Sequence, residues 1–165
     1  MRIFLLLIVL FLSPPAYAEG LSKYQPYITA ASQRFDVPEK LVRAISKQES
    51  NHNPWAVNVA GRSYMQQSKE EALVIANKAF ADGKSFDVGL MQINSYWLRR
   101  FGFTPEYVIE PQKNIIIGTW ILSKEIQRYG LGWKAVASYH TPVDRNPDRG
   151  RNYAISVINH LKRMP

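Results

Sequence analysis

The sequence contains no cysteine, which excludes both a disulfide framework and a thiol nucleophile. It also lacks the G-x-S-x-G motif of serine hydrolases and the glycine-rich loop that binds phosphate groups. Its three histidines, His52, His140 and His160, are too far apart in the sequence to predict a zinc site. We therefore expect neither a metal nor a cofactor, and carboxylate chemistry is the class that remains.

A dense basic tract is also absent, although the chain is strongly basic. Lysine and arginine together number 21 against 13 acidic residues, and the formal net charge is +8. These cations are scattered along the chain and accompany no motif that reads nucleic acid, so no specific nucleic-acid partner is expected. The charge favours an anionic environment such as a cell wall.

The N-terminus has the order of segments that is typical of a secretory signal peptide. Arg2 is followed by an apolar stretch at 3–12, two prolines, and the small-residue sequence at 16–18. We predict cleavage after residue 18, export to the periplasm, and no stable membrane span in the mature chain. An uncleaved N-terminal anchor is the alternative, but the apolar stretch is short for a bilayer.

The mature chain, 19–165, is predicted to form one domain, because no repeat, linker or low-complexity tract interrupts it. Apolar periodicity and capping signals predict a mostly helical fold. The predicted helices are 24–35, 38–49, 68–83, 95–101, 111–129 and 133–139, with a last helix that carries Tyr153 and Val157. Segment 55–64 weakly predicts a short hairpin, and 55–86 is interpreted as an insertion between two functional segments. Gly118, inside the helix at 111–129, predicts the close approach of another backbone.

Glu49 is the leading candidate for an acid. It follows Val42 and Ile45 at helical spacing, so it continues an apolar face near the end of a helix. Both burial and the negative end of the helix dipole favour the neutral carboxylic acid and would raise its pKa. The alternative is an ordinary solvated glutamate in a final helical turn.

Several motifs in order along the chain resemble one enzyme family. They are Glu49-Ser50, the segment GLMQIN at 89–94, the segment NIIIGTW at 114–120, Tyr139 and Tyr153. This set resembles the lysozyme-like lytic transglycosylases with a Slt-type catalytic domain. The long segment 55–86 makes the chain most similar to the small specialised members that are encoded with type IV secretion and conjugation systems. The resemblance implies a lysozyme-like α+β fold, predominantly helical, with a small hairpin and helix insertion.

The resemblance also implies an activity. Glu49 would protonate the glycosidic oxygen between N-acetylmuramic acid and N-acetylglucosamine. It would then act as a base on the muramoyl 6-hydroxyl, so that a 1,6-anhydro sugar forms without water, metal or cofactor. Peptidoglycan glycan strands would be the substrate, and components of an envelope secretion or conjugation machinery would be partners.

The resemblance assigns substrate-binding roles to the motif around the glycine. Gly89 would let the backbone approach a sugar, Leu90 and Met91 would pack beneath the cleft, and Gln92 would present its amide to the glycan. Ser50 belongs to the same signature as Glu49 and would also contribute to substrate binding. Asn94 would contact substrate or cap the next helix, and capping is the preferred interpretation.

The aromatic residues near the C-terminus complete the expected site. Tyr139 would help to hold an acetamido group, and Tyr153 would hydrogen-bond Glu49 and orient it. Ordinary core packing is the alternative for both tyrosines. His140 occupies a position that is usually asparagine in the family, which predicts a different or pH-sensitive polar contact.

Asp87 leaves two mechanisms open. The segment from Asp87 to Asn94 is also similar to animal-type lysozymes, in which a second carboxylate precedes the glycine. If Asp87 faces Glu49 at roughly 5 Å, retaining hydrolysis is feasible, and the chain would be a muramidase. If Asp87 only caps a turn, the single-glutamate route remains, with Asp87 at most an electrostatic helper. A non-catalytic wall-binding assembly factor with the same fold is the third alternative.

Overall fold

The computed structural model describes residues 22–164. The predicted signal peptide at 1–18 lies outside the described residues. The predominantly helical α+β fold expected from the family resemblance is confirmed, because helices dominate and one small antiparallel sheet accompanies them. The helices are α2 (Gln25–Phe35), α3 (Glu39–Ser50), α4 (Lys69–Ala81), α5 (Ser95–Phe101), α6 (Pro105–Ile109), α7 (Pro111–Tyr129), α8 (Trp133–His140) and α9 (Pro147–Arg163).

Helix α7 has the boundaries that the sequence predicts. Pro111 occupies its first position, where a missing N–H costs nothing. Gly130 ends it with a φ of 77° and donates its N–H to the carbonyl of Ile126. Ile115 and Leu122 of the predicted apolar face are buried. Helices α2, α6 and α8 pack directly on this helix.

The end of α3 positions its last two residues. Asn51 adopts the left-handed conformation, with a φ of 53°, and its N–H bonds the carbonyls near the helix end. The chain therefore turns away immediately after Glu49 and Ser50, and the breaker predicted at 51–54 is confirmed.

The sheet has the strand order β2-β1-β3-β4, and all of its pairs are antiparallel. Its strands are β1 (Ala56–Val59), β2 (Arg62–Met65), β3 (Phe86–Val88) and β4 (Ile93–Asn94). The hairpin predicted at 55–64 is confirmed as β1 and β2. Because β1 also pairs with β3, the segment at 55–86 is joined to the sheet by hydrogen bonds at its start and at its end.

Side-chain caps begin the helices that flank the sheet. At α4, the Ser68 hydroxyl accepts the N–H of Glu71 at 3.2 Å, as the predicted capping box requires. Helix α6 was not predicted, and it begins with Thr104, whose hydroxyl accepts the N–H of Tyr107 at 3.3 Å. A helix of five residues carries too little periodicity to be recognised in the sequence.

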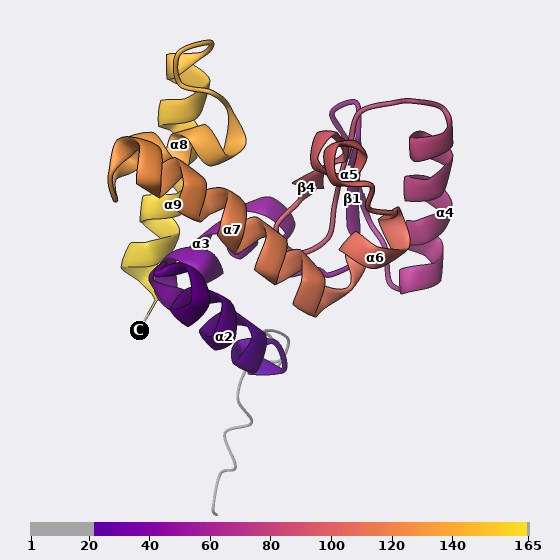
Figure 1. The fold of residues 1–165 in the computed structure, drawn as a ribbon, viewed down its shortest axis with the longest axis horizontal. Helices are drawn as coiled ribbons and strands as arrows, with labels where there is room; N and C mark the ends of the chain where they lie inside the picture. Colours follow the sequence, from indigo (N-terminus) through magenta and orange to yellow (C-terminus); the bar gives the residue numbers. More distant parts are fainter. Residues whose placement is uncertain (1–21, 165) are drawn as a thin grey trace, which may run out of the picture.

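Two groups of elements flank α7 (Figure 1). The helical group consists of α2, α3, α8 and α9, in which α9 packs on both α8 and α3, and the sheet with α4, α5 and α6 forms the other group. Strand β4 and helix α6 contact α7 directly, which connects the two groups. Within residues 22–164, no helix has the length and apolar character needed to cross a membrane.

Candidate active site

Glu49 lies in the last turn of α3 and completes the buried stripe of Val42 and Ile45. The Glu49 side chain is partly exposed. The protein that surrounds its carboxyl group nevertheless removes much of the hydration that an ionised carboxylate would have in water. Burial raises the pKa of Glu49 from 4.5 to about 8; the hydrogen bond from Tyr153 opposes this rise, and the charge of Asp87 adds to it. The carboxyl group therefore holds a proton at neutral pH, and the elevated pKa predicted from the sequence is confirmed.

Contacts between residues of α8 and α9 hold Tyr153, the hydrogen-bond partner of Glu49, in place. The Tyr153 hydroxyl donates a hydrogen bond to Oε1 of Glu49 at 2.5 Å. The His140 ring stacks on the Tyr153 ring, with centroids 4.6 Å apart and planes 6° from parallel. Arg149 donates from Nε to Nε2 of His140 at 3.3 Å. The predicted hydrogen bond between Tyr153 and Glu49 is therefore present, His140 packs on the tyrosine ring, and Arg149 holds His140.

His140 is electrostatically tuned as well as stacked. Burial lowers its pKa, and the positive charge of Arg149 lowers it further. Nε2 accepts the bond from Arg149, so the neutral imidazole carries its proton on Nδ1. The position that the family usually fills with asparagine thus supplies a neutral aromatic surface against Tyr153.

Asp87 approaches the site from the sheet. It is the middle residue of β3 and pairs in register with Asn94 of β4, whose Nδ2 donates to its Oδ1 at 2.7 Å. Burial raises the pKa of Asp87, while the bond from Asn94 and the charge of Arg149 oppose this rise. Asn94 also caps α5, because its Oδ1 accepts the N–H of Tyr96 at 2.9 Å. The preferred capping role of Asn94 is therefore confirmed, and Asp87 lies in a strand instead of capping a turn.

The turn at 89–92 joins β3 to β4 and is held by side chains from the helices. Ser50 donates to the carbonyl of Leu90 at 2.9 Å, and Tyr139 donates to the carbonyl of Met91 at 2.7 Å. The side chains of Ser50, Leu90 and Met91 are at most 1% exposed. These three side chains consequently support the turn from within and offer almost no surface to a ligand. The contact of Tyr139 with an acetamido group stays a prediction.

Gly89 is required by protein packing. Its φ is 85°, and a Cβ atom there would lie 2.2 Å from Nδ2 of Asn114. Asn114 is completely buried; its Oδ1 accepts the N–H of Met91, and its Nδ2 donates to the carbonyls of Val88 and Val108, all within 3.0 Å. Gly89 thus lets α7 fasten the turn, whereas its predicted contact with a sugar stays a prediction.

Gln92 has part of its amide committed to the backbone. Its Nε2 donates to the carbonyls of Ala56 and Gly89, each at 3.0 Å, and its φ is 45°. Within residues 22–164 no hydrogen bond reaches its Oε1. The amide oxygen is therefore the group that Gln92 can present to a sugar hydroxyl or amide, as predicted.

Sequence reasoning missed two residues of the site. Asn114 opens the segment NIIIGTW, so the family resemblance marked its position without assigning it a role. Arg149 carried none, because its role depends on the packing of α9 against α8. No group of three or more histidine, aspartate or glutamate side chains in the described chain is arranged to hold a metal ion.

Comparisons with known proteins agree with this geometry. Residues 26–156 match the family model of the transglycosylase SLT domain. Protein IpgF of Shigella sonnei is 30% identical over 139 residues, which cover 81% of this chain and 78% of that protein. Invasion protein IagB of Salmonella typhi is 28% identical over 139 residues, covering 81% and 74%. Type IV secretion system protein virB1 of Brucella abortus is 34% identical over 100 residues, covering 59% of this chain but only 42% of virB1.

The family match spans the elements that carry Glu49, Asp87, Tyr139 and Tyr153. It confirms the resemblance seen in the ordered motifs. Because the model covers more than half of the chain, and IpgF is similar over most of both proteins, the chain belongs to the transglycosylase SLT family and is a lytic transglycosylase.

Proposed function

We propose that this lytic transglycosylase cleaves the β-1,4 bond between N-acetylmuramic acid and N-acetylglucosamine in peptidoglycan and forms 1,6-anhydro-N-acetylmuramic acid. The observation that carries this proposal is the protonated Glu49, whose pKa is about 8, held by the Tyr153 hydroxyl at 2.5 Å. A general acid is most effective when its pKa lies near the working pH. This carboxyl group meets that requirement at neutral pH.

The proposed reaction uses the same carboxyl group twice. Glu49 gives its proton to the glycosidic oxygen as the bond from that oxygen to C1 of the muramoyl sugar breaks. The resulting carboxylate then takes the proton of the 6-hydroxyl while O6 attacks C1 and closes the anhydro ring. Glu49 ends the cycle protonated, and no water is consumed.

The surrounding groups support this cycle electrostatically. The carboxylate formed after the first transfer accepts a hydrogen bond from Tyr153, which stabilises it until it regains a proton. Asp87 raises the pKa of Glu49 and, when ionised, favours positive charge that develops at C1. The free Oε1 of Gln92 would orient the sugar.

A hydrolytic muramidase is the second candidate, because Asp87 is close enough for its charge to raise the pKa of Glu49. Transglycosylation remains our first choice. The hydrogen bond from Asn94 to Oδ1 of Asp87 restrains that carboxylate and reduces its ability to act as a nucleophile.

Mass spectrometry of the products from digested sacculi tests the proposal. We expect muropeptides that are one water lighter than hydrolytic products, and we expect Glu49→Gln to abolish their release. Glu125→Gln is the matched control, since Glu125 is a partly buried glutamate on α7 outside the site. Products that carry only reducing ends would replace this proposal with the muramidase, and undiminished digestion by Glu49→Gln would remove Glu49 from the mechanism.

We also propose that the chain acts in the periplasm and opens the wall locally for a secretion or conjugation apparatus. The support is the predicted signal sequence and the similarity to a protein named for a type IV secretion system. Fractionation with N-terminal sequencing tests the location, and we expect a periplasmic protein that begins at Glu19.

A further inference from the structure

A pocket of about 560 Å³ lies beside the first turn of α5, separate from the residues that contact Glu49. One side comes from the loop after α4, and the other comes from the end of β4 and from α5. Its polar lining consists of Ser85, Asn94, Ser95, Tyr96, Arg99 and Arg100.

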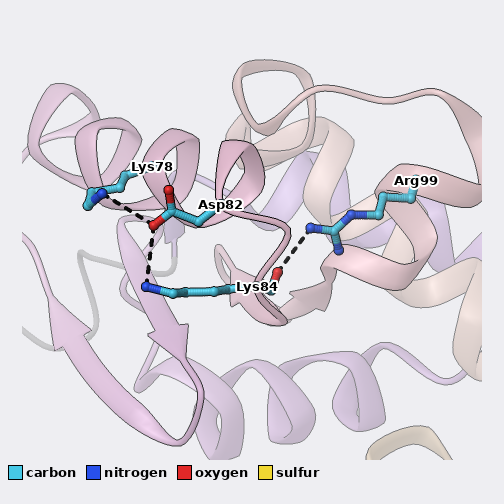
Figure 2. A network of polar contacts seen from close by, with 4 residues as sticks. All are labelled: Lys78, Asp82, Lys84 and Arg99. Carbon is cyan, nitrogen blue, oxygen red and sulfur yellow. Dashed lines mark hydrogen bonds and ion pairs between the residues drawn. The ribbon is translucent and has the colours of Figure 1, made fainter.

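Contacts within the protein orient the two guanidinium groups at this pocket. Arg99 donates from Nη2 to the carbonyl of Lys84 at 3.0 Å, as Figure 2 shows, and its guanidinium lies 5.2 Å from the ring centroid of Phe80. Arg100 donates from Nη1 to the Tyr96 hydroxyl at 3.4 Å. Each guanidinium has five N–H donors, so several remain for a ligand on each side chain.

The carboxylate beside this pocket is already occupied. Asp82 accepts from Lys78 at 3.2 Å and from Lys84 at 3.3 Å (Figure 2). None of the ion pairs found within residues 22–164 includes Arg99 or Arg100. The pocket therefore presents two oriented guanidinium groups that form no ion pair within the described chain.

Asn94 connects this pocket to the proposed active site. It lines the pocket, and its Nδ2 donates both to Ser85 Oγ at 3.4 Å and to Asp87 Oδ1 at 2.7 Å. Asp87 in turn raises the pKa of Glu49. If the glycan strand lies along Glu49 and Asp87, the single side chain of Asn94 separates it from this pocket.

We propose that the pocket binds a carboxylate of the peptide side chain that the glycan strand carries. Each arginine can offer a carboxylate two parallel N–H donors, which is the geometry guanidinium and carboxylate groups share. This inference rests on the proposed function, since it assumes that the strand lies at Glu49. Binding of a peptide carboxylate in this pocket makes the enzyme selective for glycan that still bears its peptides.

The test compares two forms of one substrate: soluble uncrosslinked glycan strands with their peptides, and the same strands after an amidase has removed the peptides. The readout is the ratio of kcat/KM on peptide-bearing strands to kcat/KM on bare strands. We expect Arg99→Gln/Arg100→Gln to lower this ratio about three- to tenfold, because exposed charge pairs contribute up to about 1 kcal/mol each. The difference should shrink at high salt.

Lys162→Gln/Arg163→Gln is the matched control, since it also removes two adjacent cations from the last turn of a helix. Its ratio should equal that of the wild type. An unchanged ratio in the Arg99/Arg100 variant, or an equal fall in the control, would overturn the proposal. If circular dichroism shows that the double variant is unfolded, Arg100→Gln alone decides, because Arg100 makes a single long contact.

A second measurement separates this inference from the proposed function. If the wild-type enzyme cleaves neither substrate, the proposed function fails. The contribution of the pocket can still be measured by fluorescence anisotropy, as the affinity of Glu49→Gln for each of the two labelled strands, with and without the arginine substitutions. The proposal for the pocket is supported if Glu49→Gln binds peptide-bearing strands more tightly than bare strands and the arginine substitutions abolish this preference. Equal binding of the two strands by Glu49→Gln refutes it.

Discussion

Glu49 is subject to opposing influences that together set the pKa near 8. Loss of hydration favours the neutral acid, the Tyr153 hydroxyl favours the carboxylate, and the charge of Asp87 disfavours it. A group that must first release a proton and then accept one benefits from this balance, because neither form is strongly preferred near neutral pH.

The two partners of Glu49 should shift the alkaline limb of the activity profile in opposite directions. Activity depends on protonated Glu49, so it falls as the pH rises through about 8. Tyr153→Phe removes a bond that lowers the pKa, and the limb moves to higher pH. Asp87→Asn removes a charge that raises the pKa, and the limb moves to lower pH.

Initial rates on purified sacculi across a pH series measure both shifts. Tyr153→Phe should also lower kcat roughly ten- to hundredfold, because a charge-assisted hydrogen bond contributes about 1.5–3 kcal/mol. Tyr107→Phe is the control, as Tyr107 is 42% exposed and lies on α6. Shifts in the same direction for both variants would contradict this account of the pKa.

At the scale of elements, α7 holds the turn at 89–92 in two places. Asn114 forms a hydrogen bond with the backbone of the turn, and the side chain of Met91 packs against the Cα of Gly118. The sequence predicted a close approach at Gly118 by another backbone. The nearest neighbour is instead a side chain, because the atoms closest to a Cβ at Gly118 all belong to the side chain of Met91.

Gly118→Ala should therefore disturb the site as well as the fold. A Cβ at this position would lie 2.6 Å from Met91 Sδ and 2.7 Å from Met91 Cβ. We expect a loss of about 1–3 kcal/mol in the free energy of unfolding and a clear fall in kcat, since the Met91 carbonyl holds the Tyr139 hydroxyl.

Thermal unfolding and sacculus digestion measure the two effects of Gly118→Ala. The matched control is Gly132→Ala, because no atom lies within 4 Å of a Cβ there and its φ of −175° suits any residue. It should change stability by less than about 0.5 kcal/mol. If Gly118→Ala kept the stability and the activity of the wild type, the turn at 89–92 could move without consequence, and the prediction would be contradicted.

At the scale of the molecule, the site assembles from both groups of elements. Glu49 and Tyr153 come from the helical group, whereas Asp87 comes from β3 and Gln92 from the turn that joins β3 to β4. A carboxyl group placed between these groups loses hydration only when the whole chain folds. Keeping Glu49 neutral in the folded protein therefore lowers the free energy of unfolding, by an amount that depends on pH.

Glu49→Gln should stabilise the protein at alkaline pH. Between pH 4.5 and about 8 the folded protein keeps the Glu49 proton while the unfolded chain releases it, so this residue lowers stability progressively as the pH rises through that window. Glutamine has no such proton, and its amide oxygen can still accept from Tyr153.

Chemical denaturation at several pH values checks this prediction. Near pH 8 we expect Glu49→Gln to be more stable than the wild type by a few kcal/mol, on the order of the free energy of the full pKa shift. Near pH 4 the difference should disappear. Glu125→Gln, outside the site, should show a smaller dependence, and a pH-independent difference for Glu49→Gln would refute the elevated pKa.

Features that depend on local periodicity and capping could be predicted from the residues alone. Helix α7, the end of α3 after Glu49, and the Ser68 cap follow from residues within one or two turns of each other. The position of Glu49 on an apolar face was equally visible, and so the elevated pKa could be predicted without coordinates.

The contacts between groups that lie far apart in the chain depend on how the elements pack. Strands β3 and β4 contain three and two residues, too few for a periodic signal, and their pairing creates the contact between Asp87 and Asn94. The stacking of His140 on Tyr153 and the bond from Arg149 depend on how α8 packs on α9. Sequence spacing fixes the face of a helix, but the packing of whole elements fixes the distances between side chains that lie far apart in the chain, and the chemistry of this site depends on those distances.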